Sequence, residues 1–127
     1  MKDLRLTVRI NRSAKDIFEF TLNPNNTPLW IDSIAKETAE PTPVEIGTIY
    51  RNWDKEGKMN EYKVVSYEPN KVFQLDATHQ DYKVRYTLTP MSEKETELEY
   101  YEWSESSQLH APFMQEILDK LKVVLEA

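Results

Sequence analysis

The 127-residue sequence contains no cysteine and only two glycines, Gly47 and Gly57. The absence of cysteine excludes disulfides and thiolate chemistry, and it predicts a protein of the reducing cytoplasm. Two isolated glycines cannot build the glycine-rich loops that hold phosphates or dinucleotides. No HExxH pattern or cysteine pair is present either, so we expect no metal and no cofactor.

Long hydrophobic runs and an excess of basic charge are also missing. No segment approaches the roughly 18 consecutive apolar residues of a membrane span, and residues 1–10 alternate in polarity, so we expect neither a membrane span nor a signal peptide. The 16 Lys and Arg residues oppose 22 Asp and Glu residues, which gives a net charge of −6. A chain this acidic repels phosphate backbones, which disfavours nucleic-acid binding.

The first part of the chain has the pattern of one strand followed by two short helices. Residues 4–10 alternate between apolar and polar, as in a half-buried strand. Ser13, with Asp16 three residues later, resembles a capping box at the start of a helix that ends before a proline. Thr27 can cap a second short helix, which contains Trp30.

Six further segments have strand character and are joined mostly by tight turns. They are residues 33–40, 47–54, 59–67, 72–77, 82–88 and 95–103. Together with the first strand they predict a seven-stranded antiparallel meander. Residues 112–126 place apolar side chains at helical spacing in one wide stripe, which needs the inner face of the sheet to cover it. The sequence therefore predicts one α+β domain over residues 1–127.

Three segments carry a resemblance to a known superfamily. "RLTVRINRSAKDIFEFTLNPNNTPLW" (5–30), "VEIGTIYR" (44–51) and "YKVVSYEPNKVFQL" (62–75) resemble the SRPBCC superfamily in its START or polyketide cyclase/dehydrase-like branch. The resemblance implies a helix-grip fold, in which a curved seven-stranded antiparallel sheet wraps around a C-terminal helix. It also implies a cavity between the sheet and that helix.

The resemblance gives expectations for Trp30 and for the C-terminal helix. It implies that Trp30 packs inward as a core residue, with a place in the wall of a ligand cavity as the alternative. The predicted helix over residues 112–126 is short for the superfamily. A short helix would leave the cavity open at one end, or it would leave apolar surface for a partner chain such as a second copy in a homodimer.

Strand alternation and helix spacing select the candidate ligand-binding residues. Three tyrosines share the inward face of their strands with leucine and valine, and each combines an apolar ring with one hydroxyl, which suits a small-molecule pocket. The helix stripe lies opposite them. The predicted set is Trp30, Tyr82, Tyr86, Leu88, Tyr100, Met114, Ile117, Leu118 and Leu121. The alternative is that the tyrosines simply fill the core.

Few residues could carry catalysis. Strict alternation points Glu102 into the cavity mouth, where a desolvated carboxylate could act as a general base. A bulge at Tyr100–Tyr101 would instead turn Glu102 outward, and we expect this rim position. His79 falls in a polar turn that we expect to be exposed, and His110 is expected to pack or cap at the last helix.

Three function classes follow. We favour a binding protein for a small apolar or aromatic molecule, because the inward tyrosines and the resemblance agree. A cofactor-free cyclase or dehydrase acting on a hydrophobic substrate in the same cavity is the first alternative. A protein-interaction domain, similar to the superfamily relatives that activate the Hsp90 ATPase, is the second. Fold membership does not choose among them, because function depends on the site.

Overall fold

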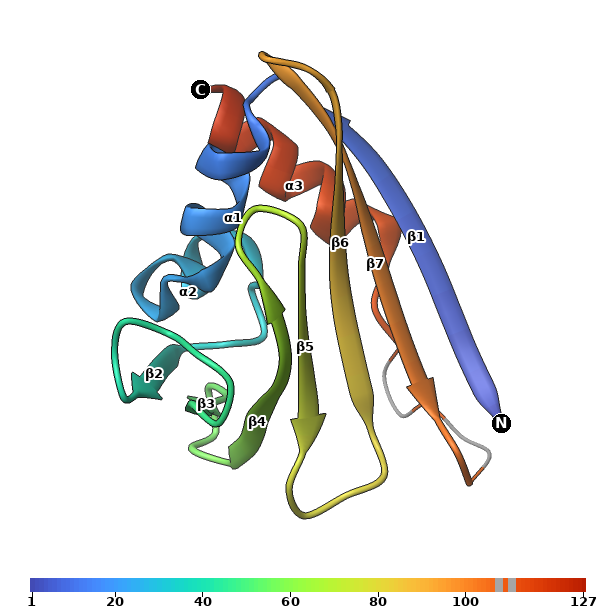
Figure 1. The fold of residues 1–127 in the computed structure, drawn as a ribbon. Coiled ribbons are helices and arrows are strands. Elements are labelled where there is room, and N and C mark those ends of the chain that lie inside the picture. Colours follow the sequence, from blue (N-terminus) through green and yellow to red (C-terminus); the bar gives the residue numbers. More distant parts are fainter. Residues whose placement is uncertain (107–108, 110–111) are drawn as a thin grey trace.

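The computed structural model describes residues 1–106, 109 and 112–127. Its seven strands form one antiparallel sheet in the order β1-β7-β6-β5-β4-β3-β2 (Figure 1). Each strand from β2 to β7 pairs with the next one along the chain, and β1 pairs with β7. The predicted seven-stranded antiparallel meander is therefore confirmed. The strands are β1 (Lys2–Ile10), β2 (Lys36–Glu40), β3 (Ile49–Trp53), β4 (Met59–Glu68), β5 (Val72–Ala77), β6 (Lys83–Ser92) and β7 (Glu95–Ser104).

Two short helices separate β1 from β2, as predicted. Helix α1 (Ala14–Leu22) begins after Ser13, whose hydroxyl oxygen accepts a hydrogen bond from the backbone N–H of Asp16 at 3.1 Å. A 3-10 turn η1 (Pro24–Asn26) leads into α2 (Thr27–Trp30). The predicted capping role of Thr27 is wrong, because Asn26 precedes α2 and the Thr27 hydroxyl instead donates to Glu37.

The last helix, α3 (Gln115–Glu126), begins later than the predicted residue 112. Met114 has an extended backbone, with φ of −117° and ψ of 148°. Phe113 therefore precedes the helix, and its ring stacks on Tyr100 with 4.0 Å between centroids. The aromatic contact with the sheet replaces the first helical turn that the sequence pattern predicted.

Strand β6 also differs from its predicted bounds. We expected it to end at Leu88, but β6 continues to Ser92 and pairs there with Glu95 of β7. The register shifts between Pro90 and Ser92, as in a bulge. A bulge accommodates a proline that cannot donate to the ladder, so the hairpin extends past it.

Helix α3 covers one end of the concave face of the sheet. Figure 1 shows α3 near that end, while the strands continue beyond it. Leu118 and Leu121 of α3 are fully buried in the main hydrophobic cluster, together with Ile10, Ile17 and Leu98. Among the residues that the structure describes, no helix has the length and apolar character needed to cross a bilayer.

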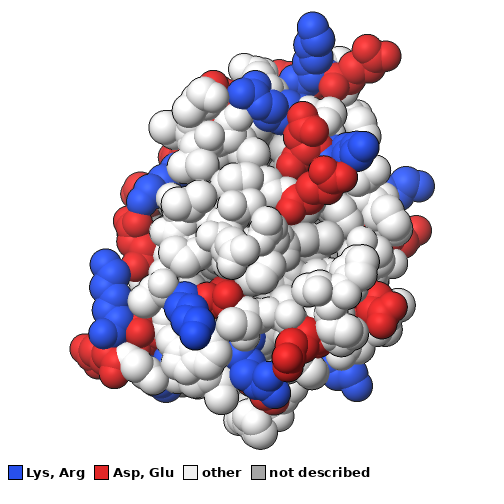
Figure 2. Space-filling model, turned by 90° about the vertical axis from the view of Figure 1, so that its left-hand side faces the viewer, with Lys and Arg blue, Asp and Glu red and all other residues white. Residues whose placement is uncertain are grey.

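Charged side chains of both signs are distributed over the surface near α1, α2 and β2. Figure 2 shows this side, where Lys, Arg, Asp and Glu side chains lie mostly around the margins and uncharged residues occupy much of the centre. The face presents no continuous basic surface of the kind that binds nucleic acid, in agreement with the net charge of −6.

Candidate functional site

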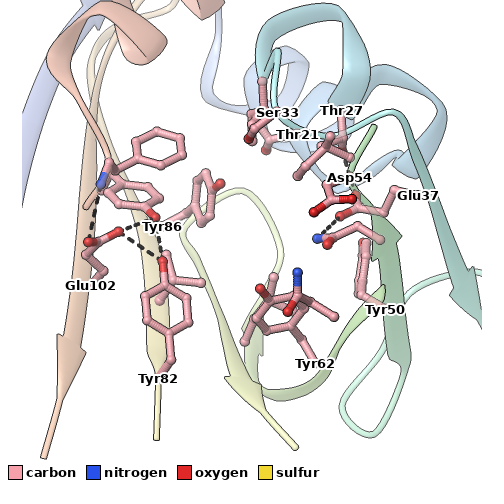
Figure 3. Close-up of a pocket in the computed structure, with 18 of the residues that line it drawn as sticks. Thr21, Thr27, Ser33, Glu37, Tyr50, Asp54, Tyr62, Tyr82, Tyr86 and Glu102 are labelled. Atoms are coloured by element: carbon pink, nitrogen blue, oxygen red, sulfur yellow. Dashed lines mark hydrogen bonds between the residues drawn. The ribbon is translucent and has the colours of Figure 1, made fainter. Parts of the chain in front are cut away.

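A cavity of about 450 Å³ lies on the concave face of the sheet, beyond the end that α3 covers. Strands β3 to β7 form its floor, and α2 with the loop that follows it forms one wall (Figure 3). Its volume falls in the usual range for small-molecule pockets. The lining residues used below are Trp30, Glu37, Asn52, Asp54, Lys58, Asn60, Tyr62, Phe73, Asp81, Tyr82, Tyr86, Tyr100, Glu102 and Phe113.

The structure brings only part of the predicted ligand-binding set to this cavity. The four aromatic members line it, namely Trp30, Tyr82, Tyr86 and Tyr100. The aliphatic members do not. Leu88, Leu118 and Leu121 lie in the closed core, Ile117 packs against that core, and Met114 is 58% exposed. These five residues do not line the cavity, because α3 packs over the other end of the sheet.

Trp30 combines the two roles that the sequence left open. Its side chain is only 2% exposed and belongs to the main core cluster, yet it also borders the cavity. The indole ring makes edge-to-face contacts with Tyr86 and Phe113, at centroid distances of 6.4 and 6.0 Å. Within the described part of the chain its N–H has no hydrogen-bond partner. Trp30 therefore joins the core to the cavity wall.

Glu102 points into the molecule, and the expected bulge is absent from the β6–β7 and β1–β7 pairings around it. Glu102 lies opposite Leu4 of β1 and Val84 of β6 in an unbroken register through Tyr100 and Tyr101. Its side chain is 2% exposed. The expectation of a rim position was wrong, and the alternation of β7 continues to the end of the strand.

Two tyrosine hydroxyls hold the buried carboxylate of Glu102. Tyr82 and Tyr100 donate to Oε1 at 2.9 and 2.7 Å, and their two hydroxyl oxygens lie 2.9 Å apart (Figure 3). The second oxygen, Oε2, has one long contact within the described residues, of 3.4 Å with the backbone N–H of Phe113. A carboxylate has about four lone-pair sites, so Oε2 keeps capacity to accept a further hydrogen bond.

A second carboxylate, Glu37 of β2, lies on the other wall of the cavity (Figure 3). It accepts hydrogen bonds from the Thr27 hydroxyl at 2.6 Å and from the Asn52 side-chain amide at 3.3 Å. Sequence reasoning missed Glu37 because β2 is short and shows no clear alternation. The one signal in the sequence was Asn52, a polar residue without an evident role in a β-rich segment. In the structure it lies opposite Glu37 in the β2–β3 pairing.

The tyrosines around the cavity keep their hydroxyl protons at neutral pH. Burial, with the nearby charge of Glu37 next in importance, raises the pKa of Tyr62 to about 12. Burial is also the main reason that the pKa values of Tyr82, Tyr86 and Tyr100 are raised. These residues therefore act as neutral donors and acceptors.

Exposed polar residues surround the mouth of the cavity. Asp81 accepts hydrogen bonds from the side chain and backbone N–H of Ser106, and these bonds lower its pKa to about 2. His79 lies in an exposed turn, as predicted, with Nε2 3.5 Å from Glu61 Oε1. His110 falls outside the described residues. In the part that is described, no three His, Asp or Glu side chains converge as a metal site.

Burial of Glu37 gives a prediction about pH. Desolvation raises the pKa of Glu37 above its ordinary value, so the folded state holds this proton more tightly than the unfolded chain does. The contribution to stability is present below the ordinary pKa and is lost as pH rises through the folded pKa. We therefore expect Glu37→Gln to gain stability relative to wild type as the pH rises above the ordinary glutamate pKa, measured by urea unfolding. Glu45→Gln, at an exposed position, should show no such trend.

Comparison with known proteins identifies the fold. The chain is similar to a START superfamily protein from Mycobacterium smegmatis, with TM-score 0.72, 16% identity and coverage of 98% of this chain and 97% of that one. It is similar to the Aha1 dimer from Colwellia psychrerythraea, with TM-score 0.72, 16% identity and coverage of 99% and 97%. Norcoclaurine synthase from Thalictrum flavum matches with TM-score 0.62 and 13% identity over 80% of this chain and 67% of that one. No curated protein matches the chain.

These likenesses establish a helix-grip fold, which is the fold that the sequence resemblance implied. A family model described as "Domain of unknown function (DUF3284)" matches residues 5–125. Because that match spans almost the entire chain, the protein belongs to the DUF3284 family.

Proposed function

We propose that the protein binds a small, largely apolar aromatic molecule in the cavity, as a cytoplasmic protein and without a metal or cofactor. The observation that carries the proposal is the combination of a volume of about 450 Å³ with aromatic walls and a few convergent polar groups. Pockets of this size and composition are typical of small-molecule sites. Trp30, Tyr82, Tyr86 and Tyr100 are the residues that we expect to contact the ligand.

Structural neighbours support a ligand-binding role. The norcoclaurine synthase structure contains dopamine and hydroxybenzaldehyde, which are small aromatic molecules, and the Mycobacterium smegmatis neighbour is a START superfamily protein. The likeness to both proteins is one of fold. The ligand is therefore argued from the cavity of this chain, where ring faces provide apolar contact and hydroxyl and carboxylate groups fix orientation.

Acid–base chemistry in the same cavity is a second candidate function. The observation that favours it is Glu102, a buried carboxylate in hydrogen-bond contact with two neutral tyrosine hydroxyls. Such a group can accept a proton from a bound substrate. An enzyme would convert its ligand during incubation, whereas a binding protein would return the same molecule unchanged, and mass spectrometry of the recovered ligand separates the two.

Thermal-shift screening against aromatic compounds tests the binding proposal. A compound at a hundred times its dissociation constant stabilises the fold by about 2.7 kcal/mol, which raises the melting temperature by several degrees. We expect Asn60→Trp to abolish this shift, because Asn60 lines the cavity and is partly exposed at its edge, so that the larger side chain blocks the space.

The matched control for this variant is Lys63→Trp. Lys63 lies on the same strand, β4, but it is exposed and does not line the cavity. The Lys63→Trp variant should therefore keep the full ligand-induced rise in melting temperature. If no compound in a broad aromatic set raises the melting temperature of the wild-type protein, the binding proposal is wrong. Equal loss of the shift in both tryptophan variants would place the binding site outside the cavity.

A further inference from the structure

The charges that line the cavity are unbalanced. Among the described residues that line it, four are carboxylates and only one, Lys58 at the exposed mouth, is a Lys or Arg. Two of the carboxylates accept hydrogen bonds from nearby backbone N–H groups. Asp54 accepts from the N–H groups of Glu56 and Lys58, and Asp81 accepts from those of Glu105 and Ser106. Glu37 and Glu102 remain, on opposite walls.

Neither Glu37 nor Glu102 has a cationic partner in the described chain. No described Lys, Arg or His nitrogen lies within 4.0 Å of either carboxylate, although eight such ion pairs occur elsewhere. The burial of Glu102 is the more costly of the two, because its side chain is 2% exposed and, among the described residues, its Oε2 contacts only the Phe113 N–H at 3.4 Å. Buried carboxylates are normally paired, because an uncompensated charge in a low dielectric is costly.

The walls between these two carboxylates are aromatic. Tyr86 stacks on Phe73 with 4.5 Å between centroids, and Tyr62 meets Tyr82 edge to face at 6.3 Å. Aromatic ring faces carry partial negative charge and attract cations, most strongly where water is excluded. The carboxylates and the ring faces therefore favour the same kind of ligand, one with an apolar ring and a positively charged group.

We propose that the ligand is an aromatic amine whose protonated nitrogen donates to Oε2 of Glu102 while its ring lies against the tyrosine wall. This inference rests on the proposed function and names the ligand class of that site. Glu37, across the cavity, adds to the negative potential and can accept from a second donor at the far end of the ligand. A charge-assisted hydrogen bond to a buried carboxylate is stronger than a neutral one, so the amine sets the selectivity.

Three probes that share an indole ring and differ in one group test this proposal. Tryptamine carries an ammonium group, tryptophol a hydroxyl and indole-3-propionate a carboxylate, each on the same two-carbon arm. By isothermal titration calorimetry near neutral pH, we expect tryptamine to bind at least about tenfold more tightly than tryptophol. Indole-3-propionate should bind weakest, because its charge is repelled by both glutamates.

Substitution of Glu102 then assigns the effect to one residue. Glu102→Gln keeps the shape and a carbonyl oxygen for the tyrosine hydroxyls, but it removes the negative charge. We expect the preference for tryptamine over tryptophol to fall to about twofold or less, and a cooperative thermal unfolding transition like that of wild type shows that the variant is folded. Glu97→Gln is the matched control, because it removes a partly exposed charge from the same strand outside the cavity.

The outcomes separate this inference from the proposed function. If tryptophol binds wild type as tightly as tryptamine does, the amine inference is wrong, and the cavity remains a site for neutral aromatic molecules. If the preference survives in Glu102→Gln, the assignment to Glu102 is wrong. If none of the three probes binds at about millimolar concentration, the inference is overturned, and the thermal-shift screen decides separately whether the cavity binds any aromatic compound.

Discussion

Replacing Trp30 with alanine is expected to lower the free energy of unfolding by about 3–5 kcal/mol. Trp30 is 2% exposed and lies where α2 closes over the sheet, with Tyr86 and Phe113 against its ring. Removing the indole deletes these contacts and joins the vacated space to the cavity. The loss is measured by chemical denaturation, from the shift of the unfolding midpoint between two proteins that have the same m-value.

A control with the same residue type distinguishes this effect from the general loss of an aromatic side chain. Trp53 of β3 is only partly buried and lies outside the cavity lining, with the Lys36 ammonium 5.1 Å from its ring centroid. Trp53→Ala should cost about 1 kcal/mol, which is typical of a partly exposed site. Trp30→Phe should fall between wild type and Trp30→Ala, because the indole N–H has no partner to lose in the described structure. Equal losses at Trp30 and Trp53 would contradict a structural role specific to Trp30.

The fold was predictable because its signals are local and repeat along the chain. Alternation in β1 and β7, the Ser13 cap of α1 and the stripe of α3 each follow from a short stretch of sequence. The order of these elements then leaves few ways to bury their apolar faces. The errors arose at ends of elements, where tertiary contacts decide. Phe113 stacks on Tyr100 instead of starting the helix, and Pro90 is accommodated by a bulge.

The candidate site was predictable only on the side formed by long, regular strands. Tyr82, Tyr86 and Tyr100 line the cavity as predicted, because alternation in β6 and β7 fixes their direction. Alternation alone also placed Glu102 correctly, and invoking a bulge there was the mistake. Glu37 could not be found in this way. It belongs to a strand of five residues, and its position depends on pairing with β3 and on the distant Thr27.

Leu121→Ala is expected to cost about 2–5 kcal/mol, because Leu121 is fully buried where α3 packs on the concave face. The value within that range depends on how far the surrounding residues, such as Leu118 and Leu98, can close the space that remains. Val123→Ala on the same helix is the control. Val123 is 68% exposed, so its loss should change stability by less than about half a kilocalorie per mole. Chemical denaturation of both variants gives the comparison.

The same variant tests the separation of the core beneath α3 from the cavity. No residue of α3 lines the cavity, whereas Trp30 does. Leu121→Ala should therefore leave the affinity of a cavity ligand close to that of wild type at a temperature where the variant is fully folded. Trp30→Ala should change that affinity, because it alters the cavity wall itself. A loss of affinity in Leu121→Ala as large as in Trp30→Ala would show that the helix and the cavity form one cooperative unit. A stability loss below about half a kilocalorie per mole in Leu121→Ala would show that α3 is not docked as described.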